Sequence, residues 1–331
     1  MILIDDTGLK SEFITNSLGG KRTSLTIGNF DGVHVGHRAI IAETIRAATG
    51  IGGASLVGTL WPHPSTVLRP NAPVRLIDPL EDRLDVLAGL GTDSVCVIPF
   101  DREVASQSAL DFLTRLKDRL GMAVLIVGPD ARMGRDRHAG IPELEGIAAE
   151  LDVELRIVDS MFVDGIAAGS GPVRRALERR DLQVVSRILA RFPSHAGKVV
   201  SGDMRGRAIG FPTLNLVVPP ERCLPGLGVY AGSVLIESDR GPVLHKAVMN
   251  LGTRPTFGEG GVLLEAHLLD FSGDLHGRRV RVYFERSLRP ERRFDSVDEL
   301  IEAIREDVDS ARRLPPAEAE LFLPWFAGAS R

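Results

Sequence analysis

The chain has 331 residues, enough for about two domains of ordinary size. Its 40 Lys and Arg residues and 44 Asp and Glu residues give a formal charge of −4, so there is no basic excess to coat a nucleic acid. Hydrophobic residues make up 44% of the chain, which excludes extensive disorder. Two cysteines cannot build a disulfide framework and point to the cytoplasm, and neither a signal peptide nor a membrane span is expected.

The first half alternates segments that are typical of strands and of helices. We expect strands at 22–28, 54–60, 94–100, 123–128 and 153–159, and helices at 37–49, 81–90 and 109–120. Short apolar strands separated by amphipathic helices indicate a parallel sheet with helices on both faces. Such sheets bind ligands at the carboxyl ends of their strands, so the loops after the strands are the places to search.

The second half shows a different sequence pattern. Two short helices, near 172–179 and 181–190, precede a stretch punctuated by Gly and Pro. Strands are then expected at 197–202, 213–218, 228–237, 244–252, 262–270 and 278–285. Their hairpin-like spacing indicates an antiparallel barrel or sandwich. A final helix is expected at 296–313, opened by Ser296 and Glu299 as a capping box, and the domain boundary is expected near 187–196.

The loop after the first strand reads GNFDGVHVGH and carries His34 and His37 just where a helix begins. Gly36 allows the backbone to approach a ligand closely, and a helix N-terminus favours phosphate. Two imidazoles there are suited to stabilise the charge that develops in nucleotidyl transfer. The alternative is a loop whose histidines only cap the helix.

Two further loops after strands carry polar side chains. His63 lies between prolines in WPHPST, and Asp130 lies in GPDARMGRDR, where it is suited to accept from a ribose or a base. A surface turn is the alternative for the first loop, and a solvated charged loop is the alternative for the second.

The segment 202–216, GDMRGRAIGFPTLNL, combines a glycine-rich loop with a strand. Glycine-rich loops present backbone N–H groups to phosphates. Thr213 and Asn215 alternate, so on a strand both point to one face, and their oxygens suit Mg²⁺ beside nucleotide phosphates.

Glu265 lies between apolar residues in the strand LLEAHLL. A carboxylate inside a barrel is costly unless it is paired or functional, and Glu265 is a candidate general base for a substrate hydroxyl. The alternative is an acid on the solvated face of an alternating strand.

Together these motifs closely resemble the prokaryotic bifunctional riboflavin kinase/FAD synthetase family over nearly the whole chain. The order and spacing of the motifs carry the resemblance, since no single motif decides it. The matching stretches include LTIGNFDGVHVGH, WPHPSTVLRP, IVGPDARMGR, GRAIGFPTLNL, LPGLGVYAG, VMNLGTRPTFG and LRPERRFDSVDEL.

The resemblance implies two catalytic domains. Residues 1–187 would form a Rossmann-like α/β nucleotidyltransferase domain that adenylylates FMN to FAD with ATP and releases pyrophosphate. Residues 188–331 would form a six-stranded antiparallel β-barrel of the riboflavin kinase type, with terminal helices, that makes FMN from riboflavin and MgATP. The expected partners are these small molecules, with no nucleic acid and no membrane, and the oligomeric state stays open.

The resemblance also implies roles for individual residues. His34 and His37 would contact the ATP phosphates of the first site, Thr213 and Asn215 would be the metal ligands that hold MgATP, and Glu265 would activate the ribityl 5′-hydroxyl. The other implied nucleotide- or flavin-binding positions are Gly28, Asn29, Phe30, Asp31, Gly36, His63, Asp130, Ser170, Arg174, Gly206, Gly210, Phe211, Pro212, Arg254 and Arg289.

Three departures from the family pattern touch the first site. AAGSGPVR (167–174) stands where the family has Ser-Ser-Thr-x-x-Arg, although Ser170 and Arg174 remain. Ala131 and Met133 replace an aromatic pair, and Trp61 stands where the family tends to place an acid.

The kinase motifs look intact, apart from Leu214 where alanine is usual. Two alternatives to a bifunctional enzyme follow. One is a riboflavin kinase with a degenerate N-terminal domain that binds nucleotide or flavin. The other is a non-catalytic sensor, against which the intact set of Thr213, Asn215 and Glu265 argues.

Overall fold

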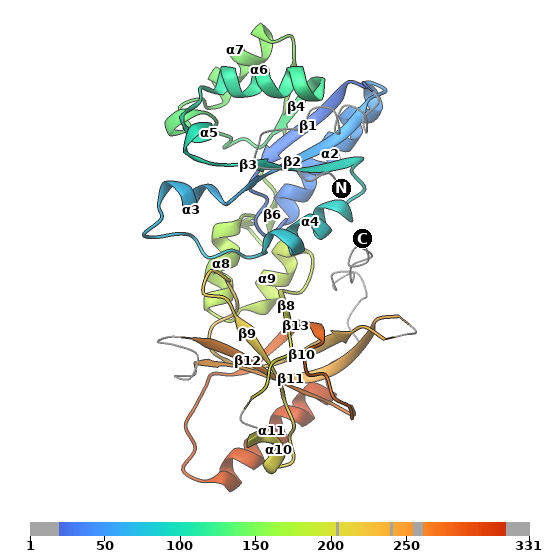
Figure 1. Cartoon of the computed structure of the whole chain (residues 1–331), viewed down its shortest axis with the longest axis vertical. Helices are drawn as coiled ribbons and strands as arrows, with labels where there is room; N and C mark the ends of the chain where they lie inside the picture. The colour runs from blue at the N-terminus through green and yellow to red at the C-terminus, as the bar shows by residue number, and fades with distance from the viewer. Residues whose placement is uncertain (1–19, 203–204, 239–240, 254–260, 316–331) are drawn as a thin grey trace. The chain divides into compact units, whose positions relative to one another are not determined.

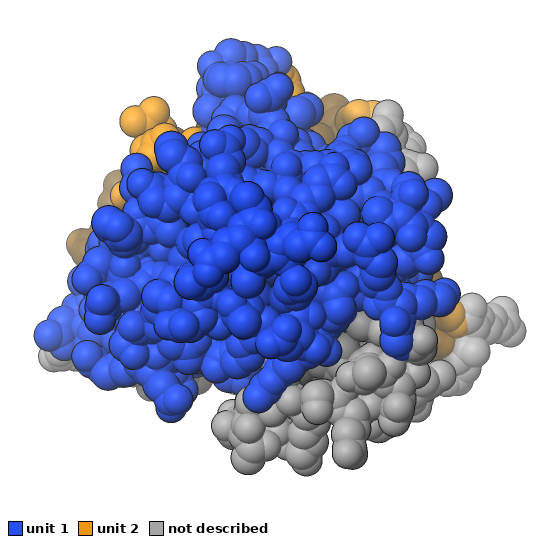
Figure 2. All heavy atoms as spheres, turned by 90° about the horizontal axis from the view of Figure 1, so that it is seen from above, with its two compact units in different colours: residues 1–170 blue, residues 171–331 orange. Residues whose placement is uncertain are grey.

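The computed structural model describes residues 20–202, 205–238, 241–253 and 261–315. The chain divides into two compact units, residues 1–170 and 171–331, which are coloured separately in Figure 2. Among the described residues, no helix combines the length and the apolar character that crossing a membrane requires.

A parallel five-stranded sheet forms the centre of the first unit (Figure 1). Its strands are β1 (Thr23–Gly28), β2 (Ala54–Trp61), β3 (Ser94–Pro99), β4 (Met122–Val127) and β5 (Glu154–Ile157). Their order is β3-β2-β1-β4-β5, so the chain moves outward from β1 first to one side and then to the other. Open α/β sheets bind their ligands at such a switch point. The predicted strands and the α/β fold class are confirmed.

Helices cover both faces of this sheet. Successive residues of β4 point to opposite faces, and each packs against a different helix. Leu125 packs in one apolar cluster with Phe112 and Leu116, while Val124 packs in another with Ala47. The helices of the unit are α2 (Val35–Gly50), α3 (Pro64–Leu68), α4 (Leu80–Ala88), α5 (Arg102–Ser106), α6 (Ala109–Leu120), α7 (Ile141–Glu150) and the 3₁₀ turn η1 (Arg135–Arg137).

The sequence predicts α2, α4 and α6, whose apolar periodicity is long enough to be seen. It misses α3, α5 and α7, and also the hairpin of β6 (Phe162–Val163) and β7 (Ile166–Ala167). Helices α3 and α5 have five residues each, too few for a helical period, and α7 carries Gly146 in its interior.

The second unit is a six-stranded antiparallel barrel in the order β8-β13-β10-β11-β12-β9. Its strands are β8 (Ser194–Lys198), β9 (Leu214–Val218), β10 (Gly228–Ile236), β11 (Val243–Thr253), β12 (Val262–Leu268) and β13 (Arg279–Arg289). The two edge strands nearly meet, since the Val200 amide donates to the Asn215 carbonyl at 2.9 Å. The predicted barrel is confirmed.

The first barrel strand lies earlier than the sequence indicates, and we correct that prediction. β8 covers Ser194–Lys198, whereas the apolar run predicted residues 197–202. The chain changes partners here: Lys198 still pairs with β13, while Val200 bridges to Asn215 on β9. The apolar pair Val199–Val200 therefore crosses the seam of the barrel and does not continue the strand.

Four helices complete the second unit: α8 (Ser170–Glu178), which begins at the last residue of the first unit, α9 (Leu182–Leu189), α10 (Arg205–Ala208) and α11 (Val297–Arg312). Helix α11 packs its Ala311 against Val229 and Val248 of the barrel. Ser296 caps it as predicted, because its side chain accepts from the Glu299 amide. The Glu299 carboxylate accepts from the Asp295 amide, one residue before the position that a capping box requires.

Candidate active sites

The loop between β1 and α2 lies at the carboxyl end of the central strand. His34 is the N-cap of α2, and its Nδ1 accepts from the His37 amide at 3.3 Å. The two imidazole rings stack, with their centroids 3.6 Å apart. The capping alternative therefore holds for His34. The cap fixes the ring at a helix N-terminus, which is where phosphate is favoured.

His37 is the electrostatically perturbed member of the pair. Its Nδ1 is buried and has no hydrogen-bond partner among the described residues. Burial lowers the pKa of His37 well below its ordinary value, and the nearby charges of His34 and Arg83 lower it further. His37 is therefore a neutral imidazole at pH 7, and its ring is packed edge-on against Phe30 at 5.1 Å between centroids.

The segment before α8 contacts this loop directly. The Ser170 hydroxyl donates to the Asp31 carbonyl at 2.8 Å. A side chain on Gly36 would place its Cβ 3.2 Å from His34 Nδ1 and 3.6 Å from the Ala168 carbonyl oxygen. The structure thus brings Ser170, Asp31 and Gly36 together with the two histidines, although they come from opposite ends of the first unit.

The backbone of the loop is held in an unfavourable shape. Phe30 and Val33 have φ angles of +47° and +35°, in the left-handed region that a β-branched residue such as Val33 rarely adopts. The Asp31 carboxylate anchors the loop by accepting from the Ile77 and Asp78 amides at 3.0 and 3.1 Å. Asp31 is only 1% exposed. In this structure its carboxylate therefore has a structural role: it fixes the loop to the backbone at Ile77 and Asp78.

Sequence reasoning missed Arg83, which is fully buried beneath the loop. Its guanidinium donates to Thr59 Oγ1 and to the Asp78 carbonyl, each at 3.3 Å, and lies 5.7 Å from the centre of the Trp61 ring. Trp61, where the family tends to place an acid, thus faces a cation. A signal for Arg83 was present, since it lies at helical spacing with Leu80 and Leu87 of α4.

The other predicted residues of the first site lie on neighbouring loops. His63 is buried and caps α3, its Nδ1 lying 2.8 Å from Ser65 Oγ, so the surface-turn alternative is wrong for its side chain. Asp130 is exposed in the loop after β4. Both loops follow strands that flank β1, so they share its edge of the sheet. Gly28 ends β1, Asn29 follows it, and Arg174 lies on α8 in the second unit.

The second unit contains a pocket of ≈ 340 Å³ between the barrel and α11. Five of its lining residues were predicted from the sequence: Gly206, Phe211, Thr213, Glu265 and Arg289. Six polar or aromatic lining residues were not: Asn250, His267, Glu291, Arg292, Phe294 and Asp307.

A row of facing residues crosses five strands of the barrel and runs through this pocket. Arg289 pairs with Val229, which pairs with Asn250. Asn250 faces Glu265, and Glu265 faces Asn215 on β9. Residues directly opposite each other in antiparallel strands share a face. Glu265 therefore lies between two asparagines and points into the pocket, so the alternative of a solvated outer face is wrong.

Asn215 is 6% exposed, and its Oδ1 has no hydrogen-bond partner among the described residues. Its amide packs on Gly202, where a Cβ would come within 2.2 Å of Asn215 Nδ2. A buried amide oxygen without a partner is suited to bind a hard cation, and Asn215 lies opposite Glu265, which lines the pocket together with Thr213. The residues thus fit the magnesium of MgATP.

A second carboxylate lies close to Glu265. Burial raises the pKa of Glu291, and the charge of Glu265 raises it further. The Glu291 carboxylate lies against the backbone of β11, since a Cβ on Gly252 would meet its Oε1 at 2.3 Å. The pocket therefore holds two acids that repel each other.

Helix α11 forms the opposite wall of the pocket. The Arg289 guanidinium donates to both Asp307 carboxylate oxygens, the shortest distance being 2.8 Å. Burial raises the pKa of Asp307 more than Arg289 lowers it. Arg289 also lies 5.5 Å from the centre of the Phe294 ring. In this structure Arg289 therefore joins β13 to α11.

The loop before β9 is shaped by its glycines. A Cβ on Gly206 would meet the Phe211 carbonyl oxygen at 2.3 Å, and Gly210 has a φ of +90°. Phe211 lines the pocket, and the Pro212 carbonyl accepts from a histidine side chain. Arg254, which was also predicted, lies outside the described residues.

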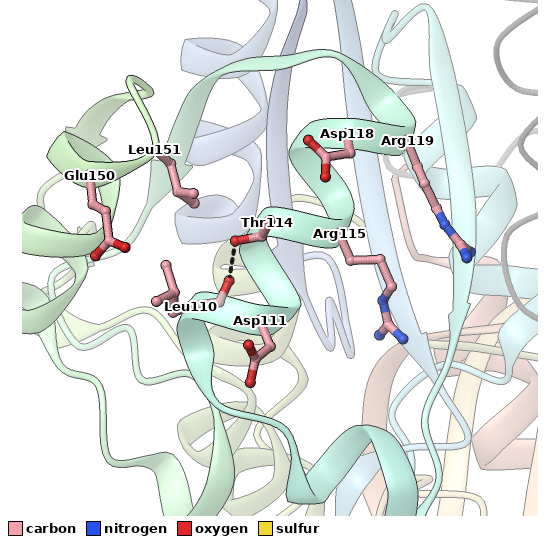
Figure 3. A pocket seen from close by; sticks show the side chains of 8 residues that line it. All are labelled: Leu110, Asp111, Thr114, Arg115, Asp118, Arg119, Glu150 and Leu151. Atoms are coloured by element: carbon pink, nitrogen blue, oxygen red, sulfur yellow. Dashed lines mark hydrogen bonds between the residues drawn. The ribbon is translucent and has the colours of Figure 1, made fainter.

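A second hollow, of ≈ 560 Å³, lies between α6 and α7 in the first unit (Figure 3). None of its lining residues was predicted to bind substrate. Figure 3 shows Arg115 and Arg119 extending away from Glu150 and Leu151, so the charged groups do not converge on one point. We assign no substrate to this hollow.

Comparison with known proteins covers both units. A family model for FAD synthetase matches residues 19–170, and one for riboflavin kinase matches residues 189–314. A Pseudomonas fluorescens protein named bifunctional riboflavin kinase/FMN adenylyltransferase is 38% identical over 297 residues, covering 89% of this chain and 93% of the relative. The chain belongs to the bifunctional riboflavin kinase/FMN adenylyltransferase family.

Other bifunctional riboflavin kinase/FMN adenylyltransferases are similar to this chain to nearly the same degree. The protein of that name from Escherichia coli K12 is 37% identical over 291 residues, covering 87% of this chain and 91% of the relative. A solved structure described as a macrolide-efflux protein from Streptococcus pneumoniae matches with a TM-score of 0.82 at 26% identity, covering 95% of this chain and 100% of that one.

The family models leave residues 171–188 outside both domains, and α8 after its first residue and most of α9 lie there. The boundary that we predict at residue 187 lies within this stretch and stays a prediction.

Proposed function

We propose that the pocket of the second unit makes FMN from riboflavin and MgATP, and that the β1–α2 loop of the first unit adenylylates FMN to FAD. The presence of both family domains supports this bifunctional assignment over a kinase with a degenerate first domain. The observation that carries the kinase assignment is the cross-strand row, which places Glu265 between Asn215 and Asn250 inside a pocket.

In the kinase reaction, Glu265 takes the proton of the riboflavin 5′-hydroxyl as that oxygen attacks the γ-phosphate of ATP. Asn215 Oδ1 and the Thr213 hydroxyl bind MgATP, whose magnesium neutralises charge on the phosphates. The ADP leaves with its magnesium, and FMN is the product. The raised pKa of Glu291 makes that carboxylate more readily protonated than an ordinary glutamate, which reduces the negative charge beside Glu265.

In the adenylyl transfer, the FMN phosphate attacks the α-phosphate of ATP, and pyrophosphate leaves. The N-terminus of α2 and the imidazoles of His34 and His37 stabilise the charge that develops on the phosphates. Neutral His37 serves as a hydrogen-bond donor, and its buried Nδ1 has no described partner that would compete. The backbone amides near Gly169 and Gly171 substitute for the hydroxyl groups that the family has at those positions.

The test for the kinase site is Glu265→Gln, assayed with riboflavin, Mg²⁺ and ATP and with the flavins separated by chromatography. We expect FMN formation to fall by about 10²- to 10⁴-fold, because the glutamine amide cannot accept the proton. Conversion of added FMN to FAD should continue, since the first unit is unchanged.

Glu302→Gln serves as the matched control, because Glu302 is exposed on α11 and does not line the pocket. Wild-type FMN formation by Glu265→Gln would remove Glu265 from the role of base. Equal loss of both activities would contradict two independent sites.

We further propose that the enzyme acts in the cytoplasm on small molecules alone. Its net charge of −4 gives no overall basic excess that would attract a nucleic acid, and both cysteines are free and buried. A salt-sensitive shift of labelled DNA or RNA by the purified protein would contradict this.

A further inference from the structure

His267 makes a contact that the kinase mechanism above does not use. It lies two residues after Glu265 on β12, so both side chains are on the same face, and both line the pocket. His267 Nδ1 lies 2.8 Å from the Pro212 carbonyl oxygen. The ring also meets Phe211 edge-on, with centroids 5.5 Å apart.

This contact lies where the backbone ladder ends. The pairing of β12 with β9 stops at Ala266 and Leu214, so Pro212 and Thr213 lie beyond the last backbone pair. Pro212 has no N–H and offers only its carbonyl for hydrogen bonding. The His267 side chain hydrogen-bonds to that carbonyl and so continues the link between β12 and the β9 segment by one more position, up to Thr213.

The bond also fixes the protonation pattern of the ring. A carbonyl oxygen only accepts, so Nδ1 of His267 must carry the hydrogen. In the neutral ring, Nε2 then has a lone pair and no hydrogen. The contribution of His267 to the loop therefore depends on one identifiable atom, Nδ1.

We propose that His267 is a positioning residue of the kinase site: by donating to the Pro212 carbonyl it holds Thr213 where MgATP binds. This inference rests on the proposed role of Thr213 in the kinase reaction. The contact lies at the MgATP side of the pocket, so its loss should weaken MgATP binding more than riboflavin binding.

Three substitutions separate the two ring nitrogens. Asparagine places an amide N–H near the position of Nδ1, glutamine places one near the position of Nε2, and alanine removes both. We expect His267→Ala and His267→Gln to raise the KM for MgATP by about three- to tenfold, the effect of one lost hydrogen bond. His267→Asn should restore most of the wild-type KM, and the KM for riboflavin should stay within about twofold in all three.

Conversion of FMN to FAD and the thermal unfolding midpoint are measured on the same variants. Wild-type FAD formation by a variant shows that the first unit is folded, and an unchanged unfolding midpoint shows that the second unit is folded as well. A change in KM then belongs to the kinase site. The inference is overturned if glutamine restores the KM and asparagine does not, because Nε2 would then be the acting atom. It is overturned as well if alanine leaves the KM unchanged or raises both KM values equally.

Failure of this inference can be told apart from failure of the proposed function. If Glu265→Gln loses FMN formation while His267→Ala keeps the wild-type KM, only the positioning role is wrong. If Glu265→Gln keeps FMN formation, the assignment of the kinase site itself is wrong.

Discussion

His37 is harder to protonate than an exposed histidine, because burial, His34 and Arg83 all lower its pKa. A neutral imidazole carries one N–H, which donates a hydrogen bond, and its other nitrogen accepts. The burial that produces this state comes from Phe30 on one side and the stacked His34 on the other. The same packing therefore sets both the orientation and the charge of His37.

His37→Ala should suppress FAD formation and leave FMN formation at the wild-type rate. Loss of one donor that stabilises transition-state charge costs about 10²- to 10³-fold in rate. The measurement is FAD produced from added FMN and ATP, with FMN produced from riboflavin as the internal control. Unchanged FAD output would exclude this imidazole from the reaction.

The low pKa of His37 also makes the stability of the first unit depend on pH. Between the folded pKa and about 6.5, the unfolded chain binds more protons at this residue than the folded chain. The free energy of unfolding therefore falls as the pH falls through that window, and it is fully retained above it. His37→Asn cannot titrate, so its unfolding midpoint should decrease less between pH 7 and about pH 5.5 than that of the wild type. Parallel curves for the two proteins would contradict this.

At the scale of elements, the sequence predicted the apolar strands and the helices that are long enough to show a period. The strands of the parallel sheet are short apolar runs, and α6 carries Phe112, Leu113 and Leu116 on one face. Five-residue helices have no period to detect. The seam at Val199–Val200 depends on which strand the chain pairs with, and local pattern does not contain that information.

The candidate sites were predicted in part for the same reason. Motifs identified His34, His37, Thr213 and Glu265, because these residues stand in recognisable loops and strands. Asn250 depends on the register between β11 and β12, which sets the partner of Glu265 across strands. Long-range register of this kind cannot be read from one strand alone.

Strand β10 contains a glycine that the barrel cannot replace. A Cβ on Gly232 would lie 2.0 Å from the Tyr283 carbonyl oxygen and 2.8 Å from Met249 Cε. Gly232→Ala should destabilise the second unit by about 3 kcal/mol, the upper end of ordinary overpacking, and lower FMN formation at 37 °C. Gly197→Ala on β8 is the control, since its Cβ would have ordinary contacts from 3.5 Å. Equal unfolding midpoints for the two variants would contradict the steric argument.

At the scale of the whole molecule, each unit contains its own candidate site, and FMN is the product of one and the substrate of the other. The groups to which we assign the chemistry lie within one unit each: His34 and His37 in the first, and Glu265 in the second. The two reactions should therefore proceed on separate molecules, with FMN passing through solution.

A mixture of two inactive variants tests this directly. Glu265→Gln lacks the kinase base, and His37→Ala lacks the adenylyl-transfer donor, so neither alone should convert riboflavin to FAD. Mixed in one tube with riboflavin and MgATP, they should produce FAD after a lag in which FMN accumulates. The readout is FAD against time, with each variant alone as its control. No FAD from the mixture, when His37→Ala makes FMN and Glu265→Gln uses added FMN, would mean that FMN must stay on one molecule.

The side chain and the backbone of Asn215 have different roles. Its side chain is a proposed ligand of MgATP, while its backbone carbonyl accepts the Val200 amide that brings the barrel edges together. A ligand that orders Asn215 therefore also stabilises the hydrogen bond between Val200, which follows β8, and β9. The Val200 amide hydrogen is therefore a reporter of nucleotide occupancy: its exchange with deuterated solvent should slow when MgATP binds, before any flavin is present.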